Sequence, residues 1–303
     1  MIEKYFDVGT VSFMSYPQLG DPDLSNQEFY EILKRIAVDP FFNLLEINPV
    51  EDAEKKEIIK KIIAESGMIL GFGGQSLILK NQLNPNSLIE EERQKAVNKL
   101  IEGIDNAHDL GSGTFTFVSG KWEKEQVEEQ VDQLVKTTVE VCKYAEKFKI
   151  HVQLEVFDFD FDKSILIGPA PRALEYSNKV RQQVSNFGLM VDLSHFPQTR
   201  ETSEFVLSLL REHITHLHVG NVVLEEGAPG RGDLHPRFGY PKSVNHIPEL
   251  CDFFVQVKKY GLYDETGKNK MRLSFEVQPM PGEDPDLLIE NSKRIMKRAW
   301  ALL

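Results

Sequence analysis

The chain has 303 residues, of which 41% are hydrophobic and 27% are charged, and its formal net charge is −12 at pH 7. This composition is that of a globular protein with a sizeable core, and the acidic balance argues against a large nucleic-acid footprint, which needs a basic face. Two cysteines are too few for a disulfide framework, the opening MIEKYFDVGTVSF does not resemble a leader peptide, and no apolar run reaches membrane-spanning length. We therefore expect a soluble, cytoplasmic protein without membrane or nucleic-acid partners.

Short β-rich runs alternate with longer amphipathic stretches along the whole chain. The runs typical of strands lie near 6–14, 44–48, 69–74, 114–119, 151–157, 187–192, 214–220 and 272–278. The helical patterns lie near 25–37, 51–66, 87–110, 123–148, 169–184, 201–211, 246–260 and 284–301. Such βα units in a row, with no long linker, predict an α/β protein with a single (β/α)8 TIM barrel domain spanning residues 1–303.

Local signals mark several element ends. Ser25 is a candidate start of the first helix, and Ser87 with Glu90 forms a capping-box pattern at the third. Gly67 and Gly188 fall at or near points where a helix gives way to a strand.

One long irregular insert, at about 221–245, follows the seventh strand and is rich in glycine and proline. A loop of that length in a compact domain is usually functional or disordered. Because it leaves the barrel beside candidate site residues, we expect a long active-site loop.

The last four strands each end in a side chain that can bind a metal. These residues are Glu155 in HVQLEVFD, Asp192 in FGLMVDLSH, His218 in ITHLHVGN and Glu276 in RLSFEVQP. They sit late in their strands, at the end of a βα barrel where active sites lie. Three carboxylates brought together repel one another unless a cation lies among them. Hydrogen-bonded polar groups in the barrel are the alternative, but four such residues on successive strands favour one divalent metal, Mn²⁺, Mg²⁺, Co²⁺ or Zn²⁺.

A second group of polar residues lies close to the first in the predicted barrel. His195 stands three residues after Asp192, and the long loop adds Asp233 and His235 in GRGDLHPRFG. Two imidazoles and a carboxylate could bind a second metal or hydrogen-bond a polyol substrate, and the sequence leaves both open. An ordinary surface turn is the remaining interpretation.

Other residues are weaker candidates for contact with substrate. Arg231 and Arg237 flank the loop motif, and a guanidinium matches carboxylate or phosphate geometry, although solvated loop arginines are equally typical. Four further residues could line the pocket, each with a weak signal of its own: Glu46, Asn48, Gln75 and Trp122. His216 lies one layer deeper than the strand end and fits a buried or supporting role better than a ligand role.

The spacing of LEVFD, VDLSH, HLHVGN and FEVQP resembles the xylose isomerase-like barrel superfamily. Within it, the pattern is similar to the sugar (phosphate) isomerases and epimerases of the tagatose 3-epimerase type. The resemblance implies that Glu155, Asp192, His218 and Glu276 bind one divalent metal. It also implies that Glu155 and Glu276 act as catalytic acid and base and that His195 contacts substrate. It covers the whole chain as a fold, but its specific motifs lie in the second half.

The same residues also resemble endonuclease IV, a trinuclear zinc enzyme on this barrel. That resemblance would add His195, Asp233 and His235 to the ligands. Strands three and four, where that family supplies histidines, read GFGGQ and FTFVSG here. Abasic-site cleavage is therefore the second choice.

We expect an enzyme of carbohydrate metabolism. The predicted activity is that of a divalent-metal-dependent isomerase or epimerase of a small sugar, polyol or sugar phosphate, with proton transfer through a metal-stabilised enediolate. The same apparatus could dehydrate a keto-polyol. An endonuclease IV-like phosphodiesterase or a non-catalytic sugar-binding barrel could also carry these residues. The exact substrate, the metal and a homo-oligomeric state are left open.

Overall fold

The computed structural model describes residues 2–303, and the strands in this range form one closed parallel barrel in the order β1 to β8. The strands are β1 (Phe6–Val11), β2 (Leu44–Ile47), β3 (Ile69–Gly73), β4 (Thr114–Phe117), β5 (His151–Val156), β6 (Phe187–Asp192), β7 (Ile214–Gly220) and β8 (Met271–Glu276). The barrel closes because β8 also pairs with β1, which sets Phe6 beside Met271 and Thr10 beside Phe275. The expected (β/α)8 TIM barrel is confirmed.

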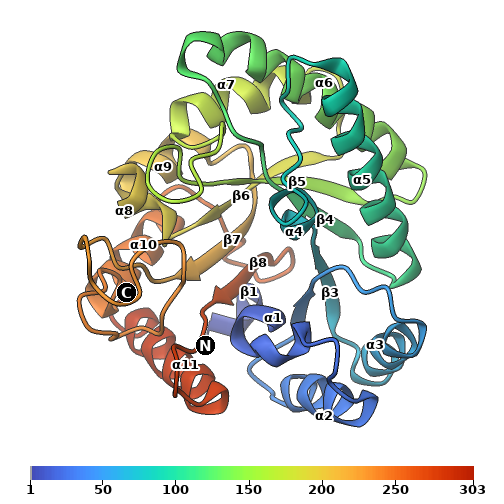
Figure 1. Cartoon of the computed structure of the whole chain (residues 1–303). Coiled ribbons are helices and arrows are strands. Elements are labelled where there is room, and N and C mark those ends of the chain that lie inside the picture. Colours follow the sequence, from blue (N-terminus) through green and yellow to red (C-terminus); the bar gives the residue numbers. More distant parts are fainter. Residues whose placement is uncertain (1) are drawn as a thin grey trace.

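Helices surround the barrel on its outer side (Figure 1). The outer helices are α2 (Asn26–Ala37), α3 (Ala53–Ser66), α5 (Glu90–Asp109), α6 (Val127–Glu146), α7 (Ala170–Arg181), α9 (Ser203–Leu210), α10 (Ile247–Lys259) and α11 (Pro285–Trp300). Short helices follow three strands directly: α1 (Ser12–Ser15), α4 (Gln75–Leu79) and α8 (His195–Thr199). Single turns of 3-10 helix lie at Ile2–Lys4, Pro17–Gly20 and Lys124–Gln126. Within residues 2–303, no helix combines the length and the apolar character needed to cross a membrane.

The two sides of each strand face different surroundings. In β5, Val152 and Leu154 are fully buried in the hydrophobic core. Gln153 and Glu155 alternate with them and therefore point into the barrel. The side-chain oxygen of Gln153 accepts a hydrogen bond of 3.1 Å from Thr116 on β4. Polar side chains thus hydrogen-bond to one another inside the barrel, below the strand ends that form its mouth.

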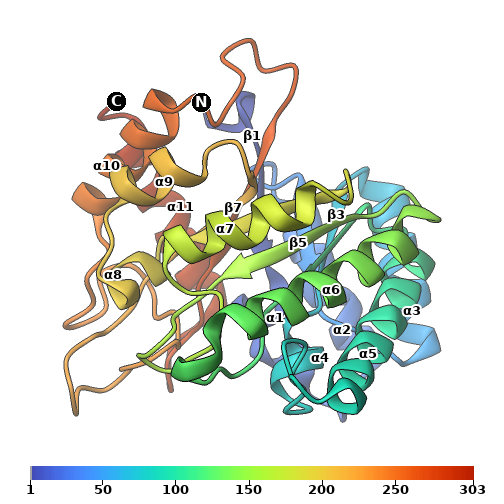
Figure 2. The same cartoon turned by 90° about the horizontal axis from the view of Figure 1, so that it is seen from above.

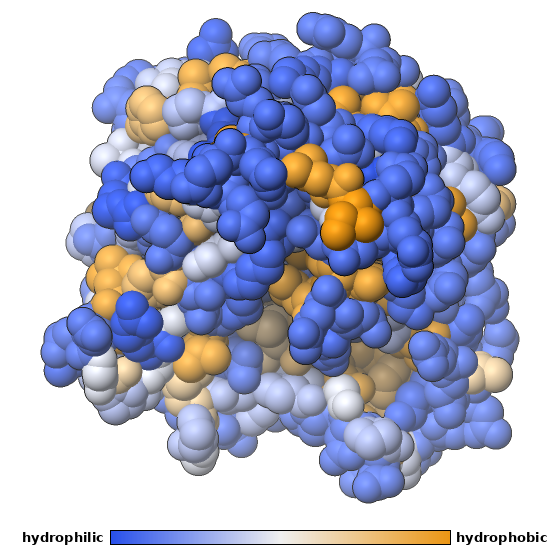
Figure 3. Space-filling view, turned by 45° about the horizontal axis from the view of Figure 1, so that its top comes forward, coloured by the Kyte–Doolittle hydropathy of each residue, from blue (hydrophilic) through white to orange (hydrophobic). Residues whose placement is uncertain are grey.

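The mouth of the barrel carries the short helices and the long loop. Figure 2 shows the segment 221–245, in yellow to orange, on the same lower side as α1, α4 and α8. The loop that precedes β8 lies on the opposite, upper side. Hydrophilic residues cover most of the face drawn in Figure 3, and some hydrophobic residues lie in a hollow in its lower half.

The first expected strand is shorter in the structure than the sequence pattern predicts. β1 ends at Val11 rather than near residue 14, because Ser12–Ser15 turns into α1. The hydroxyl of Ser12 donates a 2.7 Å hydrogen bond to the backbone oxygen of Glu46. This bond holds the first turn after β1 against the end of β2.

Two of the predicted end signals are confirmed. Ser25 caps α2 as expected, in a reciprocal capping box with Glu28. Gly67 ends α3 with a φ of 70°, a left-handed conformation that glycine adopts without steric cost.

The capping box predicted for Ser87 and Glu90 is wrong. It does not form, because α5 begins with Ile89 at its N-cap. The Ser87 hydroxyl instead bonds the Glu92 carboxylate and the N–H of Ile89.

Gly188 lies near the helix–strand junction as expected, but it is the second residue of β6 and does not end a helix. A Cβ atom built there would lie 2.4 Å from Oγ1 and 2.5 Å from Cγ2 of Thr215 on the neighbouring strand. The glycine therefore allows β6 and β7 to approach each other.

We predict that Gly188→Ala lowers the free energy of unfolding by about 1–3 kcal/mol, because the added methyl group overpacks the contact with Thr215. Urea denaturation followed by circular dichroism measures the change. Gly113→Ala is the matched control, since nothing lies within 4 Å of a Cβ atom there. Equal effects of the two substitutions would contradict the packing role of Gly188.

Candidate active site

Four polar side chains from successive strands meet at the mouth of the barrel. They are Glu155 on β5, Asp192 on β6, His218 on β7 and Glu276 on β8, and their ligand atoms all lie within 4.8 Å of one another. Their exposed fractions are 1%, 0%, 1% and 8%, so water reaches them poorly. We call these four residues the strand-end cluster. Their common position follows from strand parity in a closed parallel barrel.

The hydrogen bonds of the strand-end cluster leave a place for a cation. Asp192 Oδ1 accepts from the N–H groups of Ser194 at 2.7 Å and Gly220 at 3.1 Å. Its Oδ2 is buried and has no hydrogen-bond partner. Buried polar atoms are rarely left unsatisfied, and three carboxylates with one imidazole form a donor set that suits a divalent metal. The residues present therefore fit the expected cation.

Burial also shifts the pKa values of the strand-end cluster. Burial and the nearby charge of Glu155 together raise the pKa of Glu276 to about 7, although the charges of His235 and His218 act in the opposite direction. Although burial alone would lower the pKa of His218, the carboxylates of Glu46 and Glu276 hold it well above its usual range. In the metal-free protein, protons thus take part of the compensating role of a cation.

Glu46 on β2 belongs to this site, although its sequence signal is weak. It is 3% exposed, and its Oε1 lies 3.0 Å from Nε2 of His218 and 3.2 Å from Nε2 of His216. The other ring nitrogen of His218, Nδ1, lies 2.7 Å from Glu276. The His218 ring is therefore held at both nitrogens. A carboxylate at the end of LLEI, flanked by buried apolar residues, is the sequence signal that could have identified Glu46.

His195, Asp233 and His235 also come together beside the strand-end cluster. Asp233 Oδ1 lies 2.8 Å from Nε2 of His235 and 3.7 Å from Nδ1 of His195. His195 Nε2 lies 3.3 Å from Oε1 of Glu155. Lys163 also approaches Asp233, at 3.3 Å. The loop thus places its polar residues against β5 and β6, as its position after β7 led us to expect.

Two further groups within residues 2–303 could hold a metal. One consists of Glu46, His216 and His218, and the other contains Asp192 in place of Asp233, together with His195 and His235. Nδ1 of His235 and Oδ2 of Asp192 are 3.6 Å apart, and neither has a hydrogen-bond partner. A Cβ atom at Gly220 would lie 2.8 Å from the first and 3.2 Å from the second. The absence of a side chain at Gly220 keeps this space open for a cation or a substrate oxygen.

Comparison with known proteins agrees with the observed fold. The family model described as "Xylose isomerase-like TIM barrel" matches residues 34–250. The chain belongs to this family. No curated protein sequence matches the chain significantly.

Several solved structures share the fold at low sequence identity. A D-tagatose 3-epimerase-like protein has a TM-score of 0.72 and 18% identity, with 98% of each chain covered. L-ribulose 3-epimerase has a TM-score of 0.73 and 15% identity, covering 98% of this chain and 96% of the other. D-psicose 3-epimerase from Clostridium cellulolyticum H10, solved with D-tagatose, has a TM-score of 0.70 and 17% identity, covering 98% and 99%.

The two loop arginines of this xylose isomerase-like barrel contact other groups. Arg237 Nε pairs with Oε1 of Glu283 at 2.7 Å. The exposed guanidinium of Arg231 lies over the ring of Phe161, at 4.6 Å. Substrate contact by either arginine remains a prediction.

Gln75, at the start of α4, reaches the strand-end cluster directly. Its side-chain N–H donates to Oε2 of Glu155 at 2.9 Å, while its Oε1 is buried and has no partner. A free acceptor beside a cluster carboxylate is consistent with the expected contact to substrate.

The 221–245 loop is anchored at His235 and near its two ends. The backbone oxygen of His235 accepts a 2.7 Å hydrogen bond from the N–H of Gln278, which follows β8. Asn221 and Asn245, near the loop ends, are joined by a 2.8 Å bond from the N–H of Asn245. His235 has a φ of 46°, a left-handed conformation that is strained for a non-glycine residue. These contacts stabilise that conformation.

We predict that the protein binds a divalent cation through the strand-end cluster. Asp192→Asn should abolish tight binding of one equivalent of Mn²⁺, and Glu46→Gln should weaken it roughly 10–100-fold by releasing the His218 ring. Isothermal titration of the metal-free protein measures both, with exposed Glu102→Gln as the control. Elemental analysis of His235→Ala then shows whether Asp192, His195 and His235 hold a further ion. Unchanged affinity in Asp192→Asn would contradict the metal site.

A second prediction concerns the pH dependence of the metal-free protein. Although burial alone would lower them, nearby carboxylates raise the pKa of His195 to about 9 and that of His235 to about 10. A raised histidine pKa contributes stability that is complete below about pH 6.5 and is lost as pH rises through the folded-state pKa. Unfolding measurements from pH 7.5 to 10 should therefore show a loss of stability that is smaller in His235→Gln. An equal loss of stability in both proteins would contradict the raised pKa of His235.

Proposed function

We propose that this barrel is a divalent-metal-dependent isomerase or epimerase that moves a proton on a small sugar, polyol or sugar phosphate. The observation that carries the proposal is the meeting of Glu155, Asp192, His218 and Glu276 at one buried point. The fold is shared with enzymes named as sugar 3-epimerases, which supports a carbohydrate substrate.

In the proposed reaction, the two glutamates act on one carbon from different sides. Glu155 ends β5 and Glu276 ends β8, with β6 and β7 between them in the closed barrel. Glu155 is held by His195 and Gln75, and Glu276 is held by His218. Inverting a carbon requires removal of a proton from one face and its return to the other, so two fixed carboxylates suit this reaction.

A bound divalent cation would supply positive charge for the oxygen that becomes negative when the proton leaves. Asp192 and His218 would hold it together with the glutamates. His195 lies beside Glu155, and His235 lies beside Asp192. In the proposed complex, both histidines donate hydrogen bonds to oxygens of the sugar. Because these groups are almost fully buried, water is kept from the carbon that has lost its proton.

The endonuclease-like alternative requires more metal ligands than this mouth offers. In place of imidazoles, α4 after β3 contributes Gln75, which bonds Glu155, and strand β4 (Thr114–Phe117) carries no histidine. Two or three zinc ions per chain in the elemental analysis would favour that alternative. A product that has one water molecule less than the substrate would indicate a dehydratase on the same site.

We predict solvent-derived deuterium in a ketose, an inosose-type polyol or one of their phosphates incubated with the protein and Mn²⁺ in D₂O. Glu155→Gln and Glu276→Gln should each reduce the rate of exchange by at least about 10²-fold, because an amide cannot act as a base. Proton NMR of the sugar measures the exchange.

Circular dichroism must show that both variants are folded, and Glu102→Gln should exchange at the rate of the original protein. Full exchange in either cluster variant would refute the acid–base assignment. The absence of exchange with every sugar tested would refute the proposed activity.

A further inference from the structure

A cleft of about 420 Å³ opens beside the strand-end cluster, between α2, α3 and the mouth of the barrel. It is lined from the loops after β1 and β2 and from α4, and no residue of the strand-end cluster lines it. Its volume is therefore additional to the space at the cluster. Pockets for small organic ligands measure roughly 300–1,000 Å³, so this cleft can hold a substantial chemical group.

Asn48 and Gln75 lie between the cleft and the strand-end cluster. A Cβ atom at Gly73 would lie 2.9 Å from Oε1 of Gln75 and 3.7 Å from Oδ1 of Asn48, so both oxygens surround the same point. Both are buried and have no hydrogen-bond partner. Gln75 bonds Glu155, and Asn48 lines the cleft. Two buried acceptors without partners thus lie between the strand-end cluster and the cleft.

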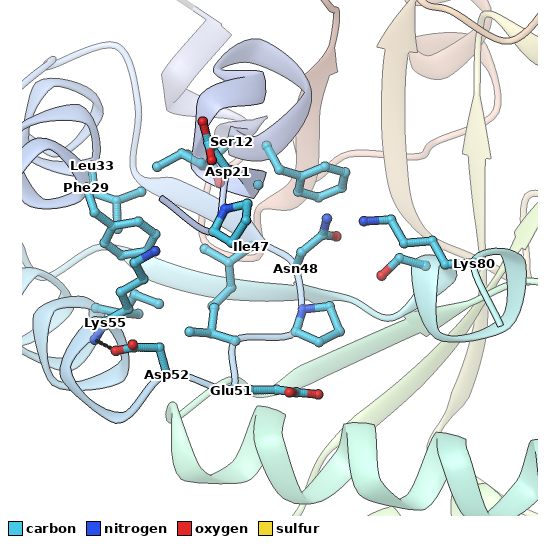
Figure 4. A pocket seen from close by; sticks show the side chains of 18 residues that line it. Ser12, Asp21, Phe29, Leu33, Ile47, Asn48, Glu51, Asp52, Lys55 and Lys80 are labelled. Carbon is cyan, nitrogen blue, oxygen red and sulfur yellow. Dashed lines mark hydrogen bonds between the residues drawn. The ribbon is translucent and has the colours of Figure 1, made fainter. Parts of the chain in front are cut away.

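The end of the cleft at Asn48 is polar. Lys80 extends from α4 toward Asn48 (Figure 4). Within residues 2–303, no carboxylate lies within 4.0 Å of its ammonium group, and that group makes no hydrogen bond. An ammonium group and free carbonyl oxygens can together donate to and accept from the hydroxyls of a sugar.

The other end of the cleft is apolar below an acidic rim. Phe29, Leu33 and Ile59 line it from α2 and α3. Figure 4 shows Phe29 and Leu33 on the side of Ile47 away from Lys80. Asp21, Glu51 and Asp52 stand at the edges, against Lys55, whose ammonium group lies over the Phe29 ring at 5.5 Å. An anionic group would meet net negative charge there, whereas a neutral apolar group would bury its surface against side chains.

We propose that this cleft binds an apolar, ring-sized substituent of the substrate while the sugar part reacts at the strand-end cluster. The inference rests on the proposed function and narrows it to sugars that carry such a substituent, as glycosides do. The polar end near Asn48 and Lys80 receives the sugar hydroxyls nearest to the link. The apolar end between α2 and α3 receives the ring.

The test compares the binding of three unreactive probes to the Mn²⁺-loaded protein by isothermal titration. They are phenyl β-D-glucopyranoside, methyl β-D-glucopyranoside and glucose 6-phosphate. The phenyl glycoside should bind at least about tenfold more tightly than the methyl glycoside, because its ring is removed from water in the cleft. Equal or undetectable binding of the two glycosides overturns the inference. Tightest binding of glucose 6-phosphate, lost in Lys80→Met, overturns it in favour of a phosphate site.

Filling the cleft provides the second part of the test. Val50 lines the cleft with its side chain, while Asn106 holds its backbone by hydrogen bonds of 3.1 and 2.8 Å. Val50→Trp should remove the advantage of the phenyl glycoside and leave binding of the methyl glycoside within about twofold. Val38→Trp, at an exposed position outside the cleft, is the matched control. If Val50→Trp does not fold, Leu19→Trp fills the cleft in its place, because Leu19 also lines it.

The two proposals fail in different ways. A phenyl-dependent, Val50-sensitive affinity without deuterium exchange on any sugar would retain the cleft and refute the enzymatic activity. Exchange on free ketoses, combined with equal affinity for the phenyl and methyl glycosides, would retain the activity and refute the cleft as a substituent site. An advantage of the phenyl glycoside that persists in both tryptophan variants of the cleft would also refute it.

Discussion

The burial of like charges at the barrel mouth is the constraint on which the rest of the site depends. Three carboxylates, those of Glu155, Asp192 and Glu276, are each at most 8% exposed. Their oxygens lie close enough together to bind one cation. Carboxylates in such a place must be protonated, paired with cations or bound to a metal. The histidines around them, with raised pKa values at His218 and His235, show the protein compensating this charge with protons.

Compensation of this charge organises the surrounding structure. Glu46 crosses from β2 to hold the outer nitrogen of the His218 ring. The 221–245 loop returns over the mouth so that His235 faces Asp192, and Asp233 holds the far nitrogen of that ring. The left-handed backbone at His235 shows that the loop adopts a strained conformation to achieve this contact. The loop therefore contacts the strand-end cluster through His235.

The division of the mouth into two halves has a chemical consequence. The ends of β5 to β8 supply charged groups, whereas the loops after β1 to β3 supply the cleft with its apolar floor. A fold shared at 15–18% identity with named epimerases does not by itself define a substrate. In the proposed function, the reaction takes place at the charged half of the mouth. The cleft half then determines which molecules bind there.

Sequence reasoning sufficed for the barrel and for the strand-end cluster, and the reason is local geometry. Alternation of side chains along a strand, together with the parallel order of βα units, brings residues such as Glu155 and Glu276 to one end and one face. No long-range information is needed, because equivalent positions on parallel strands meet once the barrel closes. The local end signals were less reliable, since Ser87 bonds Glu92 rather than capping a helix at Glu90.

Only the tertiary structure decided what lies across the barrel. Glu46 and His218 are 172 residues apart, and their contact depends on how far each strand is staggered around the closed sheet. The same holds for Arg237, whose partner Glu283 lies beyond β8. The cleft is a gap left by the packing of α2 and α3 against the mouth. The periodicity of the sequence therefore does not predict it. By itself, the sequence determined which residues point inward; long-range packing determined which of them touch and where space remains.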